Sequence, residues 1–314
     1  MWKLISFLLI SLCCFISCHK PHHDAYSPPP APQDTLTAGW KKISPSPGLE
    51  DVFFFNNTGF AISPTNFSKS TDYGNTWTLI TTPFTNLVNL GMGSDTNAIA
   101  VNFPNKLICT HNGGSSFDVV TVNDSSLTDV FFVSTTKAYA AGKCVWKTTD
   151  GGHNWAKLYE FPNSSTWSTF YFLDEQNGWL IRNDGLYKTI NAGLTWQSVN
   201  VGSGYNFPKV SGLFFVNANH GLFADDKKVA STSDGGLTWN MVYSGQTPYH
   251  DIYFLSDSIG YITDRDQILK STDGGITWTR VVKIGSGIFF ELHFTDPNHG
   301  WACGGSDVFF KYEQ

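Results

Sequence analysis

The chain has 314 residues, with 20 Lys and Arg against 26 Asp and Glu, so its formal net charge is −6. Charged residues make up 15% of the chain and aromatic residues another 15%, and there are 29 Gly and 11 Trp. This composition excludes a disordered chain, which would be rich in charge and poor in aromatic residues, and a basic protein that binds nucleic acid. It is typical of an all-β protein with many short strands.

Residues 1–18 are predicted to form a lipoprotein signal peptide. Lys3 precedes an apolar stretch over 4–12 that suits a secretion signal and is too short to span a membrane. The end of the segment resembles a bacterial lipobox in which Cys18 is acylated, although Phe15 replaces the usual Leu. Several acyl chains on Cys18 would anchor the chain firmly in the bacterial envelope, at the outer membrane. An ordinary cleaved signal, with Cys18 incidental, is the alternative.

Residues 19–38 contain five prolines and almost nothing to bury, which predicts an extended tether. His19, His22 and His23 lie in this segment. Because the segment offers no preorganised geometry, we interpret them as solvated side chains and predict neither a metal nor a cofactor.

A turn motif recurs six times downstream, at intervals of 38 to 43 residues, and Ser70–Trp77 (STDYGNTW) is one clear copy. Its acidic or amide positions are Asp72, Asn112, Asp150, Asn191, Asp234 and Asp273. This side chain is expected to bond to backbone N–H groups of its own turn, while Gly supplies positive φ and the final Trp anchors the core. We therefore interpret these residues as structural braces and not as a catalytic array.

A second repeated segment, aligned on a Phe, lies upstream of each turn and gives a four-strand unit, a to d. There are seven such segments, one of them degenerate around Leu90-Gly91-Met92, but only six turn motifs. The last unit therefore lacks strand d. Residues 39–43 match the missing strand. The sequence therefore predicts a seven-bladed β-propeller over 39–314, at about 39 residues per blade, closed by an N-terminal strand that completes the C-terminal blade. Deletion of residues 39–46 should expose a sheet edge.

The turn motifs resemble the Asp-boxes of the bacterial neuraminidase repeat. The fuller unit, a Phe-rich strand followed by Gly-Trp and Lys-Ser/Thr-Thr-Asp-Gly-Gly-x-Thr-Trp, is similar to the photosystem II assembly/stability factor-like propellers. That resemblance implies a non-enzymatic assembly role, without the photosynthetic biology. Related repeats also occur in sialidases, xyloglucan hydrolases and sortilin-type receptors, so the resemblance specifies the fold better than the function.

A candidate binding site lies at the mouth of the channel, on the face that carries the d–a and b–c loops. Four copies carry a carboxylate three residues before the aligned Phe, near this mouth: Asp51, Asp129, Asp251 and Glu291. The alternative is that each carboxylate caps its own loop or pairs with a nearby Lys. Loops on the same face add the candidate binding residues Arg182, Arg265, Trp167, Tyr249 and His250.

The preferred hypothesis is a monomeric, non-enzymatic envelope module that binds a protein or glycan partner, with no catalytic residue and no nucleic acid. Sialidases use three arginines to hold a carboxylate, whereas Arg280, one of only three arginines here, falls on a predicted outer strand. A glycoside hydrolase needs only two carboxylates, so this activity remains the alternative. The remaining cysteines, Cys109, Cys144 and Cys303, permit one disulfide without specifying it.

Overall fold

The computed structural model describes residues 34–37, 39–44, 50–163, 167–202, 204–205, 207, 210–305 and 307–314. All of them belong to one compact unit, Pro32–Gln314. The predicted signal peptide and most of the predicted tether lie outside the described residues. None of the described residues belongs to a helix of the length and hydropathy that crossing a membrane requires.

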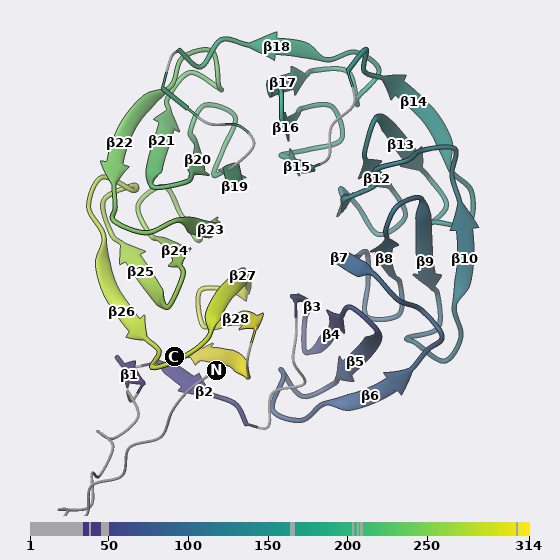
Figure 1. The fold of residues 1–314 in the computed structure, drawn as a ribbon, viewed down its shortest axis with the longest axis horizontal. Helices are drawn as coiled ribbons and strands as arrows, with labels where there is room; N and C mark the ends of the chain where they lie inside the picture. Colours follow the sequence, from purple (N-terminus) through teal and green to yellow (C-terminus); the bar gives the residue numbers. More distant parts are fainter. Residues whose placement is uncertain are drawn as a thin grey trace, which may run out of the picture. The chain divides into compact units, whose positions relative to one another are not determined.

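The described strands form seven antiparallel sheets arranged in a ring, which confirms the predicted seven-bladed β-propeller (Figure 1). Each sheet is one blade, numbered here in chain order and listed from its innermost strand outward. Blades 1 to 4 are β3 (Asp51–Phe55), β4 (Thr58–Ser63), β5 (Asn66–Ser70) and β6 (Thr78–Thr81); β7 (Leu87–Met92), β8 (Ala98–Asn102), β9 (Lys106–Thr110) and β10 (Asp118–Thr121); β11 (Asp129–Phe132), β12 (Ala138–Ala141), β13 (Cys144–Thr148) and β14 (Ala156–Glu160); and β15 (Ser168–Phe172), β16 (Gly178–Arg182), β17 (Gly185–Thr189) and β18 (Gln197–Val199). Blades 5 to 7 are β19 (Val210–Phe215), β20 (Gly221–Asp225), β21 (Lys228–Thr232) and β22 (Asn240–Ser244); β23 (Tyr249–Phe254), β24 (Gly260–Asp264), β25 (Gln267–Ser271), β26 (Thr279–Lys283) and β1 (Thr35–Leu36); and β27 (Ile288–Asp296), β28 (His299–Gly305), β29 (Val308–Glu313) and β2 (Trp40–Lys42).

Burial falls from the second strand of a blade to its outer strand. Every residue of β12, β16, β20 and β24 is buried, because neighbouring blades cover both faces of these strands. Most of their residues are apolar and do not alternate with polar ones, as expected for a strand that packs on both sides, but Arg182, Asp225 and Asp264 are buried at the ends of β16, β20 and β24. The outer strands β6, β10 and β18 consist mainly of exposed residues.

Aromatic stacking joins one blade to the next. The indole of Trp179 in β16 stacks on Phe215 of blade 5, with ring centroids 3.5 Å apart. In the same way Trp301 in β28 stacks on Phe54 of blade 1 at 3.6 Å. Such pairs contribute about 0.5–1.5 kcal/mol beyond their burial. The Gly-Trp step of the repeat therefore holds neighbouring blades face to face.

The N-terminal strand β2 pairs with β29 and completes blade 7, as predicted. Trp40 lies opposite Tyr312 in this pairing and is 4% exposed. Its indole contacts the rings of Tyr261, Phe294 and Tyr312. The two ends of the propeller therefore share one sheet and one core cluster.

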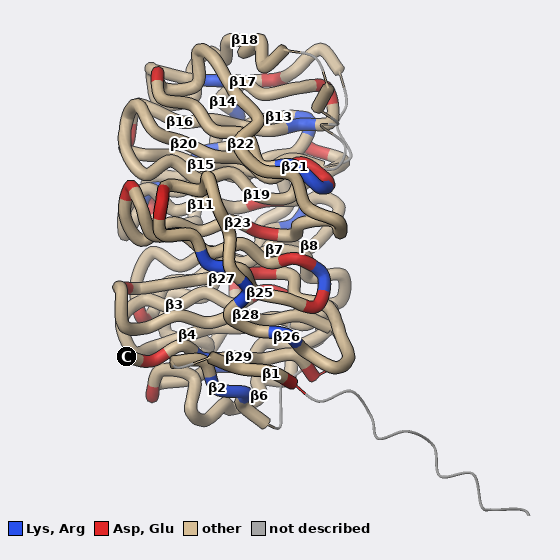
Figure 2. Tube along the Cα trace, turned by 90° about the vertical axis from the view of Figure 1, so that its left-hand side faces the viewer, with Lys and Arg blue, Asp and Glu red and all other residues tan. Residues whose placement is uncertain are grey.

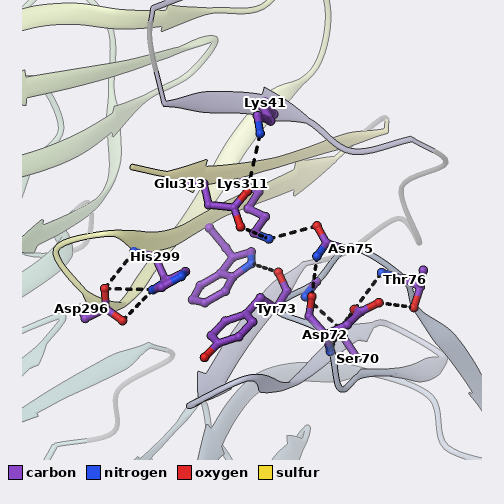
Figure 3. Close-up of polar contacts among 12 residues, drawn as sticks. Lys41, Ser70, Asp72, Tyr73, Asn75, Thr76, Asp296, His299, Lys311 and Glu313 are labelled. Atoms are coloured by element: carbon purple, nitrogen blue, oxygen red, sulfur yellow. Dashed lines mark hydrogen bonds and ion pairs between the residues drawn. The ribbon is translucent and has the colours of Figure 1, made fainter.

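The seam between blades 7 and 1 carries polar contacts in addition (Figure 3). Lys311 is 1% exposed, and its ammonium group donates to Oδ1 of Asn75 at 3.0 Å and pairs with Glu313 at 2.8 Å. Nε1 of Trp301 donates to the carbonyl oxygen of Tyr73 at 2.9 Å. These bonds attach the last blade to the hairpin turn of the first.

Blade 6 has a fifth strand that the sequence did not predict. Thr35 and Leu36, which fall within the predicted tether, pair antiparallel with the outer strand β26. Oδ1 of Asp34 also accepts a hydrogen bond from the backbone N–H of Gly285. The propeller fold therefore includes residues before position 39, and β1 satisfies N–H and C=O groups at an edge that β26 would otherwise expose.

The six hairpin turns share one hydrogen-bonding pattern, shown by Asp234. Its Oδ1 accepts from the backbone N–H of Thr238 at 2.9 Å and its Oδ2 from the hydroxyl of Thr238 at 2.6 Å. These bonds lower the pKa of Asp234 to about 2. The same bond to a backbone N–H four residues on is made by Asp72, Asn112, Asp150, Asn191 and Asp273.

The hairpin turns lie on the same face of the ring as the turns between first and second strands. Gly235 of one hairpin turn donates its N–H to the carbonyl oxygen of Asn219 in the first turn of the same blade, and Gly274 bonds to Ser258 in the same way. Gly235 has a φ of 70°, which favours glycine. The loops between blades therefore lie at the other end of the inner strands.

Candidate functional site

The four predicted carboxylates occupy equivalent positions on the inner strands of blades 1, 3, 6 and 7. In blades 6 and 7 a β-bulge immediately precedes the carboxylate, at 249/251 and 289/291, and similar bulges occur in blades 2 and 5. A bulge inserts one extra residue and redirects the side chains that follow. The extra residues Val88, Ser211 and His250 line the central cavity.

Three of the carboxylates bond to the backbone of the next blade, which is neither of the roles that the alternative interpretation predicted. Asp51 accepts from the N–H of Leu90 at 2.7 Å, Asp129 from Phe170 at 2.6 Å and Asp251 from Leu292 at 2.9 Å. Blade 2 carries Asn89 at the same position, and its Oδ1 accepts from the N–H of Val130 at 2.9 Å. This inner-strand position therefore links consecutive blades around the channel.

Burial raises the pKa of these carboxyl groups. The pKa of Asp51 and of Asp251 rises to about 7 and that of Asp129 to about 6, with burial as the largest cause in each case. The pKa of Glu291 lies well above its usual value, because it is buried and faces the charges of Asp251 and Asp51. A side-chain hydrogen bond between Glu291 and Asp251 raises the pKa of Glu291 and lowers that of Asp251.

A collar of six half-buried rings surrounds the channel two residues further along the inner strands. Its members are Phe53, Phe131, Tyr171, Phe214, Tyr253 and His293. Neighbouring ring centroids lie 4.1 to 6.1 Å apart from Phe131 through Tyr171, Phe214, Tyr253 and His293 to Phe53. Blade 2 contributes Gly91 instead, where a Cβ would lie 3.2 Å from the carbonyl oxygen of Val130. The collar is thus interrupted at one blade.

The polar members of the collar also bond from blade to blade. The hydroxyl of Tyr171 donates to the carbonyl oxygen of Phe215, and that of Tyr253 to Phe294, each at 2.7 Å. Nε2 of His293 lies 2.9 Å from the carbonyl oxygen of Phe54. Burial lowers the pKa of His293 to about 4, so the ring is neutral at pH 7.

These inner-strand residues enclose a cavity of about 630 Å³. Its lining comes from the loops between blades, from the adjoining part of the inner strands and from the turn between β20 and β21, and includes Trp167, His250 and Asp226. Lys and Arg are interspersed with acidic residues elsewhere on the ring (Figure 2), but among the described residues none lines the cavity. The cavity therefore combines aromatic surface with several carboxyl groups and no basic side chain other than His250 and His293.

The structure does not bring all the predicted binding residues into this cavity. Arg182 is fully buried, and its guanidinium donates to the carbonyl oxygens of Gly142 and Asn163 and lies over the ring of Phe161. The binding role predicted for Arg182 is therefore wrong, because the side chain is enclosed between blades. Arg265 is exposed in its loop and is not part of the lining.

Two predicted aromatic residues lie at the cavity in different ways. Tyr249 is part of the lining, yet it is 2% exposed and packs in a core cluster with Leu222 and Ile252. Trp167 is half-buried at the mouth and packs against the core cluster of blades 4 and 5. The collar itself was not predicted, although an aromatic or His residue recurs two positions after the inner-strand carboxylate position.

Cys109, Cys144 and Cys303 are free and buried. Burial raises the pKa of Cys109 to about 12 and that of Cys144 to about 11. The three thiols are therefore small core side chains in this structure, and the disulfide that the sequence left open does not form among them.

Comparison with known proteins supports the fold. No family model matches the chain. The chain is 25% identical over 187 residues to a xyloglucanase of Paenibacillus sp, a match that covers 59% of this chain and 14% of that enzyme. The structure of YCF48 bound to D1 peptide superimposes with a TM-score of 0.75 at 16% identity, covering 90% of this chain and 99% of that chain.

A GH74 enzyme from Niastella koreensis is also similar, with a TM-score of 0.62 at 16% identity, over 82% of this chain and 51% of that chain. At these identities the likeness is one of fold. The chain is therefore a seven-bladed β-propeller similar in fold to YCF48 and to this GH74 enzyme.

Proposed function

We propose that this protein is a non-enzymatic binding module whose central cavity receives a segment of a protein or glycan partner. The observation that carries the proposal is the cavity itself, a collar of six rings beneath a cluster of carboxyl groups with no Lys or Arg in the described lining. Aromatic rings suit peptide side chains and sugar faces. The similar structure of YCF48 is bound to a peptide, which agrees with this use of the fold.

The chemistry of the lining favours a peptide with a Lys or Arg side chain. A cation in the cavity would be attracted to the ring faces and would favour the ionised form of Asp51 and Asp251. Because burial holds the pKa of both groups at about 7, the affinity for such a cation should rise between pH 5.5 and pH 8. A neutral ligand should lack this pH dependence.

A binding experiment with matched peptides tests the proposal. A library of short Lys- and Arg-containing peptides and their acetylated or citrulline counterparts would be titrated at pH 5.5 and pH 8. We expect tighter binding of the basic peptides at pH 8 and loss of binding in Phe214→Ala. Ile190→Ala is the control, because Ile190 is 67% exposed in a hairpin turn on the opposite face. Equal loss in both variants, or no binding of peptides or glycans, would contradict the proposal.

A photo-crosslinking residue locates the partner in cells. The phenylalanine analogue would replace Phe214 in one strain and Ile190 in another. A stoichiometric adduct obtained only from position 214 is expected for a partner that enters the cavity. An adduct obtained only from position 190 would assign recognition to the hairpin-turn face.

We further propose that Cys18 carries the lipid that anchors the protein in the bacterial envelope, at the outer membrane, as a monomer with a Pro-rich tether. The support is the sequence of residues 1–18. Labelled palmitate should be incorporated into the wild-type chain and not into Cys18→Ser. Release of Cys18→Ser as a soluble protein would fit the same assignment, whereas unchanged labelling would exclude it.

A glycoside hydrolase is the second candidate, favoured by the hydrogen-bonded Glu291–Asp251 pair and by the partial similarity to a xyloglucanase. A carboxyl group with a raised pKa suits a general acid. Against it, Asp51, Asp129 and Asp251 each accept a backbone N–H of the next blade, which commits an oxygen to the fold. Turnover of xyloglucan or another polysaccharide that is abolished in Glu291→Gln and Asp251→Asn would establish the hydrolase.

A further inference from the structure

One seam of the hairpin-turn face differs from the other seams in its chemistry. His111 lies in the hairpin turn of blade 2, His153 in that of blade 3, and Asp118 at the start of β10. One potential ligand atom from each of these residues lies within 4.8 Å of the others. The two histidines are 42 positions apart in the chain, so this group forms only when the blades pack together.

The three residues depart from the repeat at its corresponding positions. Where blade 3 has His153, the other hairpin turns have Asn75, Ser115, Leu194, Leu237 and Ile276. Where blade 2 has His111, the others have Thr71, Thr149, Ile190, Ser233 and Thr272. A residue required by the repeated structure would recur, so the coincidence of two His and one Asp at one seam calls for a local explanation.

The two imidazoles stack on each other, and one nitrogen of His111 is left without a hydrogen-bond partner. Their ring centroids are 3.7 Å apart and their planes differ by 24°. Nε2 of His111 is buried and has no hydrogen-bond partner in the structure, since the nearest Asp118 oxygen lies 3.9 Å away. A buried nitrogen without a partner is costly unless something binds it.

We propose that His111, His153 and Asp118 bind a divalent transition-metal ion, with Zn²⁺ as the probe. Two imidazoles and one carboxylate are ligands that Zn²⁺ accepts, and a fourth position would be open to water or to a partner's side chain. In tetrahedral coordination the ligand atoms are about 3.3 Å apart, so the group would contract on binding. The side chains of His153 and Asp118 are exposed, so a change of their rotamers would bring their ligand atoms closer to His111.

The hairpin turn that carries His153 is held close to His111. Gly151, with a φ of 78°, lies in the hairpin turn of His153, and a Cβ there would lie 3.9 Å from Nδ1 of His111. The backbone N–H of Gly151 also bonds to the carbonyl oxygen of Thr136. The turn of blade 3 is thus fixed close to His111, and a bound ion would fasten blade 2 to blade 3.

Calorimetric titration of the detergent-solubilised full chain with Zn²⁺ tests the site. The parent protein for this experiment carries His19→Gln, His22→Gln and His23→Gln, so that the N-terminal histidines do not contribute. We expect one ion per chain and an increase in melting temperature on binding. His111→Gln, His153→Gln and Asp118→Asn should each weaken the affinity about tenfold or more.

His220→Gln is the matched control. His220 lies on the same face and faces a single carboxylate, Asp257, at 3.5 Å, without a second His. This variant should bind Zn²⁺ like the parent. Because His153 is exposed, His153→Gln should keep the melting temperature of the metal-free parent, which separates lost ligation from misfolding. The proposal is overturned if the parent does not bind Zn²⁺ at micromolar concentration, or if His111→Gln and His153→Gln bind it unchanged.

Discussion

Oδ2 of Asp51 lies 2.7 Å from the backbone nitrogen of Leu90 and accepts its hydrogen, joining the inner strands of blades 1 and 2. One blade further on, Oδ1 of Asn89 accepts from Val130 in the same way. An ionisable and a non-ionisable side chain thus make the same bond at successive seams. This pair separates the contribution of the hydrogen bond from that of the charge.

Asp51→Asn should keep the inter-blade bond and remove a titrating group. The folded protein holds the pKa of Asp51 at about 7, above the value of about 4 in an unfolded chain, so the folded state binds more protons between these pH values. Stability supplied by this group is therefore present at low pH and lost as pH rises to 7. Urea unfolding at pH 5 and pH 8 should give a smaller difference for Asp51→Asn than for wild type.

Asp51→Ala should instead lose the bond at both pH values. It leaves the N–H of Leu90 buried without an acceptor, at a cost of about 1–3 kcal/mol in the free energy of unfolding. The same urea series measures this effect. A stability equal to that of Asp51→Asn would show that the inter-blade bond contributes nothing.

His293→Tyr should flatten the acid side of the stability profile. The pKa of His293 is about 4 in the folded protein, below its ordinary value near 6.5, so the folded state binds fewer protons in that window and loses stability as pH falls through it. A Tyr at this position has a precedent in Tyr253, whose hydroxyl donates to the next blade. The variant should gain on wild type at pH 5 relative to pH 7.5; a constant difference between the two proteins would contradict the assignment.

Trp40→Ala tests closure of the ring. Trp40 is 4% exposed and contacts three aromatic rings, so its truncation should lower the free energy of unfolding by about 3–5 kcal/mol. Leu36→Ala is the control, since Leu36 lies in the fifth strand of blade 6 and is 38% exposed. Chemical denaturation measures both variants, and sedimentation shows whether an opened blade 7 associates through its free edge. An effect of Trp40→Ala no larger than that of Leu36→Ala would mean that β2 is dispensable.

Substitution of Arg182 should lower stability far more than substitution of Arg265. Arg182→Ala removes a charged donor from the carbonyl oxygens of Gly142 and Asn163 and should cost about 1.5–3 kcal/mol for the buried bond to Gly142. Arg265→Ala, at an exposed loop position, should change stability by less than about 0.5 kcal/mol. Thermal unfolding of the two variants makes the comparison. Neither change should weaken peptide binding in the cavity, because neither side chain lines it.

The repeat made the ring predictable. Equivalent residues in a repeated unit must occupy equivalent places, so the spacing of the turns and the unmatched strand at Trp40 determined the number of blades and the closure. The same logic brought Asp51, Asp129, Asp251 and Glu291 to one channel, and the structure places all four in the cavity lining.

Features that depend on a neighbouring blade were not predictable from the sequence of one unit. Arg182 reads as a loop residue, but it ends β16, which lies enclosed between blades. The bond from Asp51 to Leu90 requires the backbone of the next inner strand to be in place. The His111–His153 pair has no local spacing to reveal it, because packing of two hairpin turns creates it.

Gly91 makes blade 2 different from the other six blades at the level of the aromatic collar. Six blades contribute a ring at this inner-strand position and blade 2 contributes Gly91, so the surroundings of a ligand in the cavity would change if it were turned by one blade. A ligand with one flat side and one bulky side would therefore have one preferred orientation in the cavity. The missing ring thus removes the rotational equivalence of the blades around the cavity.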